Sequence, residues 1–311
     1  MKNTLALLSA LLFNCPATYA AGLPTGSGSF DFTVPHSAKK IEVFSYQPPG
    51  ANTRTPIVFV LTGLNRDADK YRDAWVKNAR KNKLIVIAPY FSQQDYPGSD
   101  GYNLGNLINP QTGKLNPQGE WAFTVIDSLF TEMQNQRITQ QKSYYLFGNS
   151  AGCQFVHRML TLIPQPKVKA AICAAAGWWT LPNIQTPWPY GLKNAPIAVN
   201  RQQLVHYLAL PVLITVGSKD NNPNHPLLRR SPHAMAQGDS RLQRAKTYFI
   251  TAEQLAQHNK VPFNWQFTIL AGVGHSGSKM SAYAAQQFGR FEQYGKFSVQ
   301  DEELSNKSAA F

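Results

Sequence analysis

The pentapeptide 148–152, Gly-Asn-Ser-Ala-Gly, carries a serine that could act as a nucleophile. Small residues on both sides of Ser150 allow a sharp turn from a strand into a helix, and such a turn raises the serine hydroxyl above the end of a sheet. An apolar run, 143–147, precedes the pentapeptide, and a stretch of helical period, 151–162, follows it. The Gly-x-Ser-x-Gly pattern is weak by itself, so the prediction depends on these flanking elements.

A serine hydroxyl needs a base that takes its proton during attack. Of the seven histidines, His275 alone follows the last expected strand, 265–270, and it lies in the glycine-rich segment 272–277. The glycines leave the backbone free to turn there, so the imidazole can lean over the sheet. We therefore predict His275 as the general base.

A serine and a histidine of this kind act together with a third side chain, a carboxylate that orients the imidazole and stabilises its cation. Between the serine and the histidine, the sequence offers only Asp220, Asp239 and Glu253. Glu253 falls inside an expected helix, and Asp239 lies in the turn ahead of it, where capping is the ordinary role. Asp220 follows the expected strand 211–216, at the edge where open α/β sheets gather functional residues. We expect Asp220 to orient the histidine.

Backbone amides are expected to stabilise the negative charge that develops on the substrate carbonyl. The turn at the serine fixes the amide of Ala151, and the loop after the expected strand 56–61 offers the amide of Leu64. Arg66 and Tyr71, close to that loop, are candidates for contacting the substrate. Capping of the helix that follows is the alternative role for both.

Two long connections, 92–119 and 177–201, interrupt the regular pattern. Loops of this length inside a compact domain are usually lids or binding loops. The second connection contains Trp178 and Trp179, which we expect to line the substrate pocket. An irregular loop held to the core by its Trp rings is the alternative.

Short apolar runs alternate with stretches of helical period along most of the chain. Strands are expected at 30–34, 40–46, 56–61, 84–89, 143–147, 168–175, 211–216 and 265–270, and helices at 69–82, 120–136, 151–162, 241–259 and 276–291. Several strands are unbroken apolar runs, which is typical of parallel strands covered on both faces. The pattern predicts one α/β domain over residues 21–311, with a doubly wound, mostly parallel eight-stranded sheet and helices on both faces.

With a serine elbow, an aspartate and a histidine in this order after the expected strands, the chain resembles the α/β-hydrolase superfamily. Segments 62–67 (TGLNRD), 102–106 (YNLGN) and 220–229 resemble its secreted bacterial branch of polyhydroxybutyrate-depolymerase-like and feruloyl-esterase-like proteins. The resemblance covers residues 30–291 and implies an α/β-hydrolase fold with serine hydrolase activity. The chain departs from many relatives at Thr62, where they have a histidine. The short segment after His275 makes a soluble or dispersed ester a better candidate than a crystalline polymer.

The chain has 311 residues and a formal net charge of +13, so partners with negative charge must be considered. No Asp or Glu occurs between Met133 and Lys219, a stretch that contains Ser150, Trp178 and Trp179. Either the mouth of the site attracts an anionic ester, or the surface is uniformly basic. A nucleic-acid partner is not expected, because no recognition motif is present. No glycine loop with a following Lys-Ser or Lys-Thr indicates phosphate binding either.

The first 20 residues have the pattern of a secretory signal peptide: Lys2, an apolar run at 5–13, and small residues before a cut after Ala20. The apolar run is too short to span a membrane. We therefore expect a secreted or periplasmic protein without a membrane span. An exported chain permits a disulfide between Cys153 and Cys173, and two buried free thiols are the alternative. The sequence has no metal-ligand spacing and indicates no cofactor.

Together these observations predict an exported serine hydrolase that cleaves carboxylic esters through an acyl-enzyme. Its substrate would be a small or oligomeric ester, which is anionic if the basic stretch surrounds the site. A peptidase or amidase with the same three side chains is one alternative. A non-catalytic binding protein on the same scaffold is another. The oligomeric state stays open.

Overall fold

The computed structural model describes residues 22–37 and 39–299, and the expected signal peptide 1–20 lies outside them. At its centre is an eight-stranded sheet with the strand order β1-β2-β4-β3-β5-β6-β7-β8. The strands are β1 (Gly26–Thr33), β2 (Lys40–Gln47), β3 (Ile57–Leu61), β4 (Ile85–Pro89), β5 (Tyr144–Asn149), β6 (Val168–Ala174), β7 (Val212–Gly217) and β8 (Trp265–Leu270). Strand β2 pairs antiparallel with both β1 and β4, and the six strands β3 to β8 run parallel to one another. The mostly parallel sheet is confirmed, and each expected strand overlaps one of these strands.

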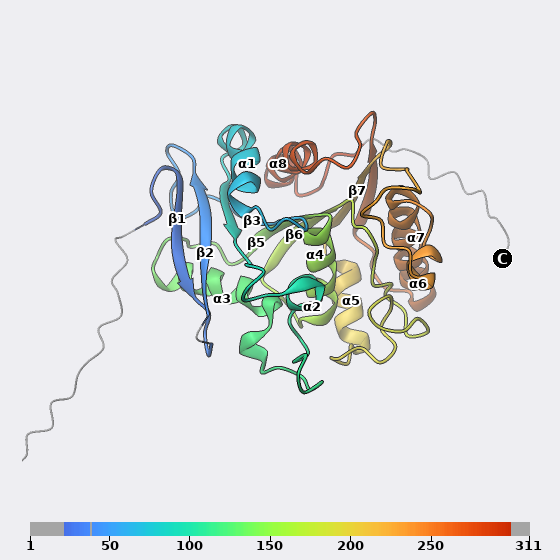
Figure 1. Ribbon diagram of the computed structural model, residues 1–311. Coiled ribbons are helices and arrows are strands. Elements are labelled where there is room, and N and C mark those ends of the chain that lie inside the picture. The colour runs from blue at the N-terminus through green and yellow to red at the C-terminus, as the bar shows by residue number, and fades with distance from the viewer. Residues whose placement is uncertain (1–21, 38, 300–311) are drawn as a thin grey trace, which may run out of the picture.

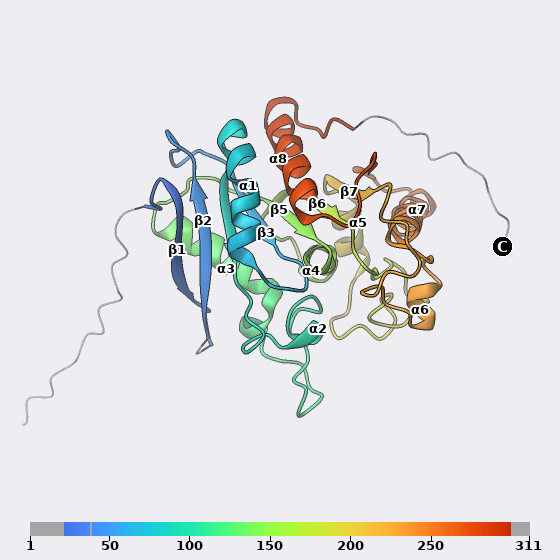
Figure 2. The same cartoon turned by 45° about the horizontal axis from the view of Figure 1, so that its top comes forward.

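Helices cover both faces of the sheet (Figures 1 and 2). On one face, α1 (Ala68–Asn82) and α8 (Gly277–Tyr294) lie side by side. The other face is covered by α3 (Ala122–Asn135), α4 (Ala151–Leu162), α5 (Arg201–Ala209) and α7 (Arg241–Asn259). Three short segments complete the list: α2 (Gly98–Gly101) and the 3-10 helix η1 (Gln118–Glu120) lie between β4 and α3, and α6 (Pro232–Met235) lies between β7 and α7. This arrangement is the doubly wound α/β architecture that the sequence pattern predicts.

The apolar strands are buried on both faces, and alternate residues of each strand enter two different cores. In β5, Tyr145 and Phe147 face the core under α1 and α8, where Phe147 packs against Trp75. Leu146 faces the opposite core, which also takes Phe130 of α3. Side chains alternate across a strand, so an unbroken apolar run indicates a strand covered on both sides.

Among the described residues, α5 is the one helix of more than four residues that the sequence pattern did not predict. Only Tyr207 and Leu208 of its nine residues are buried, so it shows little helical periodicity. Its beginning has a recognisable signal, a capping box: the side chain of Asn200 accepts from the backbone of Gln203, and the side chain of Gln203 accepts from the backbone of Asn200.

A disulfide joins Cys153 in α4 to Cys173 in β6, which settles the alternative left open by the sequence. Both cysteines are fully buried. The bond therefore ties the helix that follows Ser150 to the neighbouring strand of the sheet. Among residues 22–37 and 39–299, no helix is long and apolar enough to cross a membrane.

Candidate active site

Ser150 lies at the sharp turn between β5 and α4, with φ 56° and ψ −114°. This is an unusual backbone conformation for a residue with a side chain, and it is typical of a strained nucleophile turn. The glycines on both sides are sterically required. A Cβ on Gly152 would lie 2.1 Å from the carbonyl oxygen of Leu61, and one on Gly148 would lie 2.2 Å from the carbonyl oxygen of Gly152.

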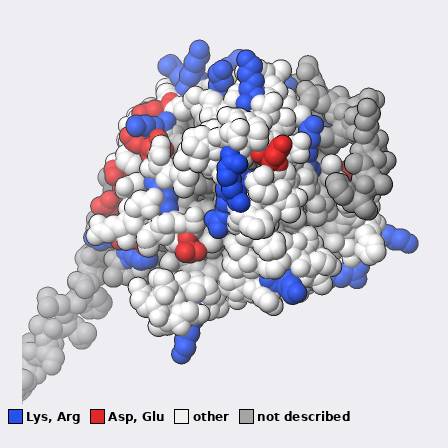
Figure 3. Space-filling view, turned by 45° about the vertical axis from the view of Figure 1, so that its right-hand side comes forward, with Lys and Arg blue, Asp and Glu red and all other residues white. Residues whose placement is uncertain are grey.

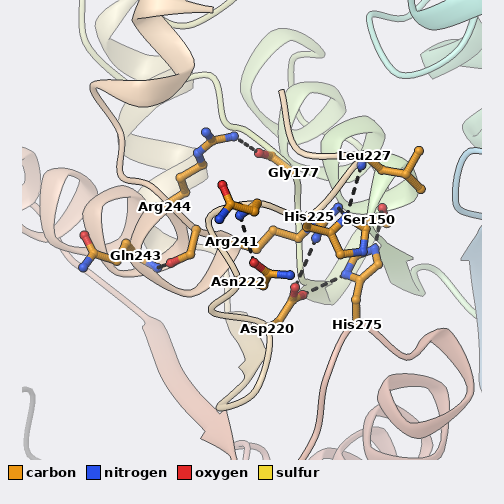
Figure 4. A network of polar contacts seen from close by, with 12 residues as sticks. Ser150, Gly177, Asp220, Asn222, His225, Leu227, Arg241, Gln243, Arg244 and His275 are labelled. Carbon is orange, nitrogen blue, oxygen red and sulfur yellow. Dashed lines mark hydrogen bonds and ion pairs between the residues drawn. The ribbon is translucent and has the colours of Figure 1, made fainter. Parts of the chain in front are cut away.

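Ser150, His275 and Asp220 meet above the carboxyl end of the sheet (Figure 4). The Ser150 hydroxyl lies 3.1 Å from His275 Nε2, and His275 Nδ1 lies 2.7 Å from Asp220 Oδ2. Asp220 follows β7, and His275 lies between β8 and α8. With Nδ1 donating to the carboxylate, Nε2 is free to accept the serine proton. The structure thus brings together the three side chains that the sequence places at separate strand ends.

Close contact between two loops holds Asp220 and His275 in place. The backbone amide of Lys219 donates to the carbonyl of Val273 over 2.8 Å. Gly217 makes this approach possible, because a Cβ there would lie 2.1 Å from the same carbonyl oxygen. The end of β7 and the loop after β8 therefore lie in direct contact, which places the carboxylate close to the imidazole.

Arg241 is a buried partner of Asp220 that the sequence reasoning missed. Its Nη1 donates to Asp220 Oδ1 over 3.1 Å, and the two side chains are only 3% and 4% exposed. Its Nη2 donates to His225 Nδ1 over 3.3 Å. Arg241 is the first residue of α7, and a cation at a helix N-terminus is electrostatically unfavourable. That mismatch is the sequence signal that could have indicated a specific acidic partner.

The environment of Asp220 favours its charged form. Burial alone would raise the pKa of this carboxyl. The hydrogen bond and the charge of His275, together with Arg241, outweigh burial and lower the pKa below its ordinary value. A charged carboxylate is the form that can stabilise an imidazolium.

The serine and the histidine open into a cavity of about 580 Å³. Leu64 and Ala151 line it, and neither backbone amide has a hydrogen-bond acceptor among the described residues. Neither amide is therefore committed to another acceptor, as a role in binding an oxyanion requires. Tyr71 also lines the cavity, and its hydroxyl accepts from Asn149 Nδ2 over 2.9 Å. Burial raises the pKa of Tyr71, so at neutral pH its phenol keeps the proton.

Arg66, a predicted substrate contact, has a different role. It is buried, and its guanidinium donates to the carbonyls of Phe91, Tyr96 and Gly98. It also stacks on Tyr102 at 4.0 Å. Because Arg66 points into the loop after β4, it lies away from the cavity beside Ser150 and instead holds that loop.

The two tryptophans that we expected to line the pocket, Trp178 and Trp179, lie in different environments. Trp178 lines the cavity, as expected. Trp179 is fully buried and stacks on Tyr248 of α7 at 4.2 Å, so the prediction that it contacts the substrate is wrong. Adjacent residues in an extended segment point to opposite sides, and here only one side is the cavity.

Basic groups outnumber acidic ones in the cavity wall. Lys70, Arg229 and Arg241 line it, and Asp67 is the acidic residue among the lining residues. Over the face shown in Figure 3, basic side chains are spread rather than gathered in one patch. The positive charge is therefore general over this face, with an additional contribution at the cavity.

One cluster has the residue types of a metal site: Cys153, His157 and Cys173, with potential ligand atoms within 4.8 Å of one another. Each of its potential ligand atoms already has a partner within the protein. The two sulfur atoms are bonded to each other. His157 Nδ1 donates to the carbonyl of Cys153, and its Nε2 accepts from the amide of Thr180. The cluster therefore offers no free ligand in this state.

Comparison with solved structures identifies the fold and the family. Poly(aspartic acid) hydrolase-1 from Sphingomonas sp. KT-1 is 36% identical, with a TM-score of 0.80, over 85% of this chain and 98% of that chain. The chain belongs to the α/β-hydrolase superfamily. Within this superfamily it is also similar to LpqC, the poly(3-hydroxybutyrate) depolymerase from Bordetella parapertussis. That protein is 29% identical, with a TM-score of 0.79, over 88% of this chain and 92% of that chain.

The resemblance to the depolymerase-like branch of the α/β hydrolases is thereby confirmed. An S-formylglutathione hydrolase from Agrobacterium tumefaciens, 15% identical with a TM-score of 0.54, shares the fold over 88% of this chain and 98% of that chain. No family model matches the sequence, and neither does any curated protein.

Proposed function

We propose that the protein is an exported serine hydrolase that cleaves carboxylic esters through an acyl-enzyme on Ser150. The observation that carries this proposal is the relay from Ser150 through His275 to Asp220, at 3.1 Å and 2.7 Å, beside a cavity of about 580 Å³. The similar structures named above are hydrolases, which supports the reaction class. The signal-peptide pattern at residues 1–20 supports export.

In the first half of the reaction, Ser150 Oγ bonds to the carbonyl carbon while its proton passes to His275 Nε2. The carbonyl oxygen becomes an oxyanion, which the amides of Leu64 and Ala151 stabilise. The carbon–oxygen bond to the alcohol then breaks, and the alcohol leaves with the proton from His275. Asp220 keeps the imidazole in the required orientation throughout.

In the second half, water takes the place of the alcohol. His275 accepts a proton from the water as its oxygen bonds to the acyl carbon, and it returns that proton to Ser150 Oγ as the acyl bond breaks. The carboxylic acid is released and the enzyme regains its starting form. No metal or cofactor enters these steps.

Amide cleavage by the same three side chains is a second candidate function. One observation favours it: the relative with 36% identity acts on poly(aspartic acid), an anionic polyamide. Lys70 and Arg229 in the cavity wall suit a substrate with carboxylates. Under this reading the leaving group is an amine, which must receive its proton from His275.

Turnover of matched p-nitrophenyl esters and p-nitroanilides of graded acyl length separates the two functions. We expect ester turnover in the wild type and a loss of about a thousandfold or more in Ser150→Ala and in His275→Ala. Faster turnover of the anilides, relative to their uncatalysed rates, would favour the amidase. Ester turnover that survives both substitutions would contradict the proposed mechanism, and the absence of turnover of either substrate series by the wild type would favour a non-catalytic binding protein.

A further inference from the structure

Two arginines, Arg229 and Arg241, line the cavity, and they differ in what their guanidinium groups bind. Arg241 is buried, and its Nη1 and Nη2 are committed to Asp220 and His225. Arg229 is exposed. Within the part of the chain that the structure describes, only its Nε has an acceptor, the hydroxyl of Tyr190 at 2.6 Å. Of the two guanidinium groups, that of Arg229 is therefore the one open to a ligand.

The free donors of Arg229 form the fork that carboxylates bind. A guanidinium has five N–H donors, and the bond to Tyr190 uses one, so the four on Nη1 and Nη2 remain. No described Asp or Glu forms an ion pair with Arg229. Two parallel N–H groups match the two oxygens of a carboxylate, and such charged hydrogen bonds are roughly twice as strong as neutral ones. The fork therefore suits a ligand that has a carboxylate.

Aromatic rings orient this guanidinium. The Cζ atom of Arg229 lies 4.8 Å from the centroid of a ring of Trp178 and 5.5 Å from that of Tyr190. Tyr190 is buried, and its hydroxyl also lies 2.5 Å from Ser231 Oγ. The backbone is held as well, because the Arg229 carbonyl accepts from Arg244 Nη2 over 2.8 Å. A side chain that is oriented before its ligand arrives loses less entropy on binding.

A second arginine against Trp178 adds positive potential at this position. Arg158 is fully buried, and its Cζ lies 4.1 Å from the centroid of a Trp178 ring. It donates to Thr180 Oγ1 and to backbone carbonyls, and no carboxylate among the described residues pairs with it. Burial lowers the pKa of Arg158 to about 9, and the charge of Arg229 adds to this effect. Arg158 thus stays charged at neutral pH, and an anion at Arg229 would compensate both cations.

We propose that Arg229 is a specificity-determining residue that binds a carboxylate of the substrate, at a distance from the ester bond that is cleaved. Its Nη1 and Nη2 donate to the two carboxylate oxygens. This inference rests on the proposed function and narrows its substrate class to esters that also contain a free carboxylate. Half-esters of dicarboxylic acids and short oligoesters with an acid end have this chemistry.

Lys70 is the other exposed cation of the cavity wall. Its ammonium is a point charge on a flexible stem, so it attracts anions without imposing a geometry. Arg229 presents a planar fork in a fixed orientation and can therefore distinguish a carboxylate from a carboxamide of the same shape. The two residues consequently predict different results when each is replaced by a neutral side chain.

Pairs of esters that differ only in this charge test the proposal. On the acyl side, the monomethyl esters of succinic, glutaric and adipic acid are compared with the methyl esters of the corresponding monoamides. On the alcohol side, 4-acetoxybutanoate is compared with 4-acetoxybutanamide. Hydrolysis is followed by proton release at neutral pH and low ionic strength, and each rate is divided by the rate constant for hydroxide hydrolysis. p-Nitrophenyl acetate, which is neutral, reports basal activity.

We expect the wild type to prefer the carboxylate member of at least one pair by about tenfold or more in kcat/KM. In Arg229→Gln this preference falls to about threefold or less, mainly through KM. Arg229→Lys keeps the charge but not the fork, so its preference lies between these values. In Lys70→Gln the preference falls by less than about threefold, because an exposed point charge is screened by solvent.

Arg230→Gln is the matched control. Arg230 is the exposed neighbour of Arg229, it does not line the cavity, and its Nη2 donates to the carbonyl of Pro223 over 2.6 Å. The substitution removes the same charge from the next position in the chain. It should keep both the preference and the basal activity of the wild type.

Equal normalised rates within every pair for the wild type would overturn the carboxylate site, whether or not the variants fold. A preference that survives in Arg229→Gln, or that falls as much in Arg230→Gln, would overturn it as well, because general positive charge would then explain the attraction. If the wild type hydrolyses neither p-nitrophenyl acetate nor any paired ester, the proposed function itself fails. That result is distinct from an active enzyme without a preference for carboxylates.

Discussion

Arg241 donates a hydrogen bond over 3.1 Å to Asp220, which accepts from His275 over 2.7 Å at its other carboxylate oxygen. The carboxylate is thus held at both oxygens in a buried position. Removal of one partner from a buried ion pair leaves an uncompensated charge, which is costly. Arg241 is therefore a positioning residue that acts on His275 through Asp220.

Replacement of Arg241 by Met should lower the free energy of unfolding at pH 7 by about 3 kcal/mol. It should also lower kcat/KM for esters. Because the pKa of Asp220 is lowered in the folded protein, its ion pairs stabilise the fold above the ordinary pKa of 3.8 and lose this effect as pH falls through the folded value. The stability difference between wild type and variant should therefore shrink below about pH 4. Chemical denaturation across this pH range measures it.

Arg80→Met is the matched control, since Arg80 is exposed near the end of α1. It should change stability by less than about 0.5 kcal/mol at every pH. A constant difference between Arg241→Met and wild type down to pH 3 would contradict the assigned ion pair.

His157 makes the fold sensitive to acid. Burial lowers the pKa of its imidazole well below the ordinary value of 6.5, so the folded protein keeps it neutral. The unfolded chain binds a proton at this site below pH 6.5, and the stability contribution is therefore lost as pH falls from there. The free energy of unfolding should therefore depend less on pH between 6.5 and 4.5 in His157→Gln than in the wild type. An unchanged slope in the variant would contradict the prediction.

Replacement by alanine should destabilise the protein at Gly152 and should be tolerated at Gly274. A Cβ on Gly152 would lie 2.1 Å from the Leu61 carbonyl oxygen, so the helix must move away from β3. Gly152→Ala should lower the free energy of unfolding by about 3 kcal/mol and displace Ser150. Gly274 has nothing within 4 Å of a Cβ, and Gly274→Ala should be tolerated. Thermal unfolding and ester turnover of the two variants check this contrast.

Loss of the bond between Cys153 and Cys173 should destabilise the protein by about 3 kcal/mol, because the bond closes a loop of roughly 20 residues in the unfolded chain. The double variant Cys153→Ala, Cys173→Ala tests this by denaturant unfolding, with and without reductant. Reductant should destabilise only the wild type. Equal denaturant concentrations at the midpoint of unfolding for wild type and double variant, both without reductant, would contradict the prediction.

The sequence placed Ser150, Asp220 and His275 at one sheet edge because each follows an apolar run that predicts a parallel strand. The carboxyl ends of such strands meet at the same edge, so strand order alone brings distant residues together. Local periodicity likewise predicted α3, in which Val125, Leu129 and Met133, spaced four positions apart, are all buried. These features depend on elements that local sequence defines.

The errors concern contacts that only tertiary packing decides. Arg66 was predicted at the substrate because it lies close to the oxyanion loop, yet its guanidinium turns toward carbonyls of the loop after β4. Trp179 was paired with Trp178, although the two rings enter different environments. Asn103 and Gln154, two cavity residues that are hydrogen-bonded to each other, lie 51 positions apart, and no local pattern indicates their contact.

Mass spectrometry after reaction with a fluorophosphonate shows whether Ser150 is the nucleophile, since this probe bonds covalently to an activated serine. We expect one adduct on wild-type protein, mapped to the peptide that contains Ser150, and no adduct on Ser150→Ala. Stoichiometric labelling of Ser150→Ala, or of a peptide without residue 150 in the wild type, would contradict it.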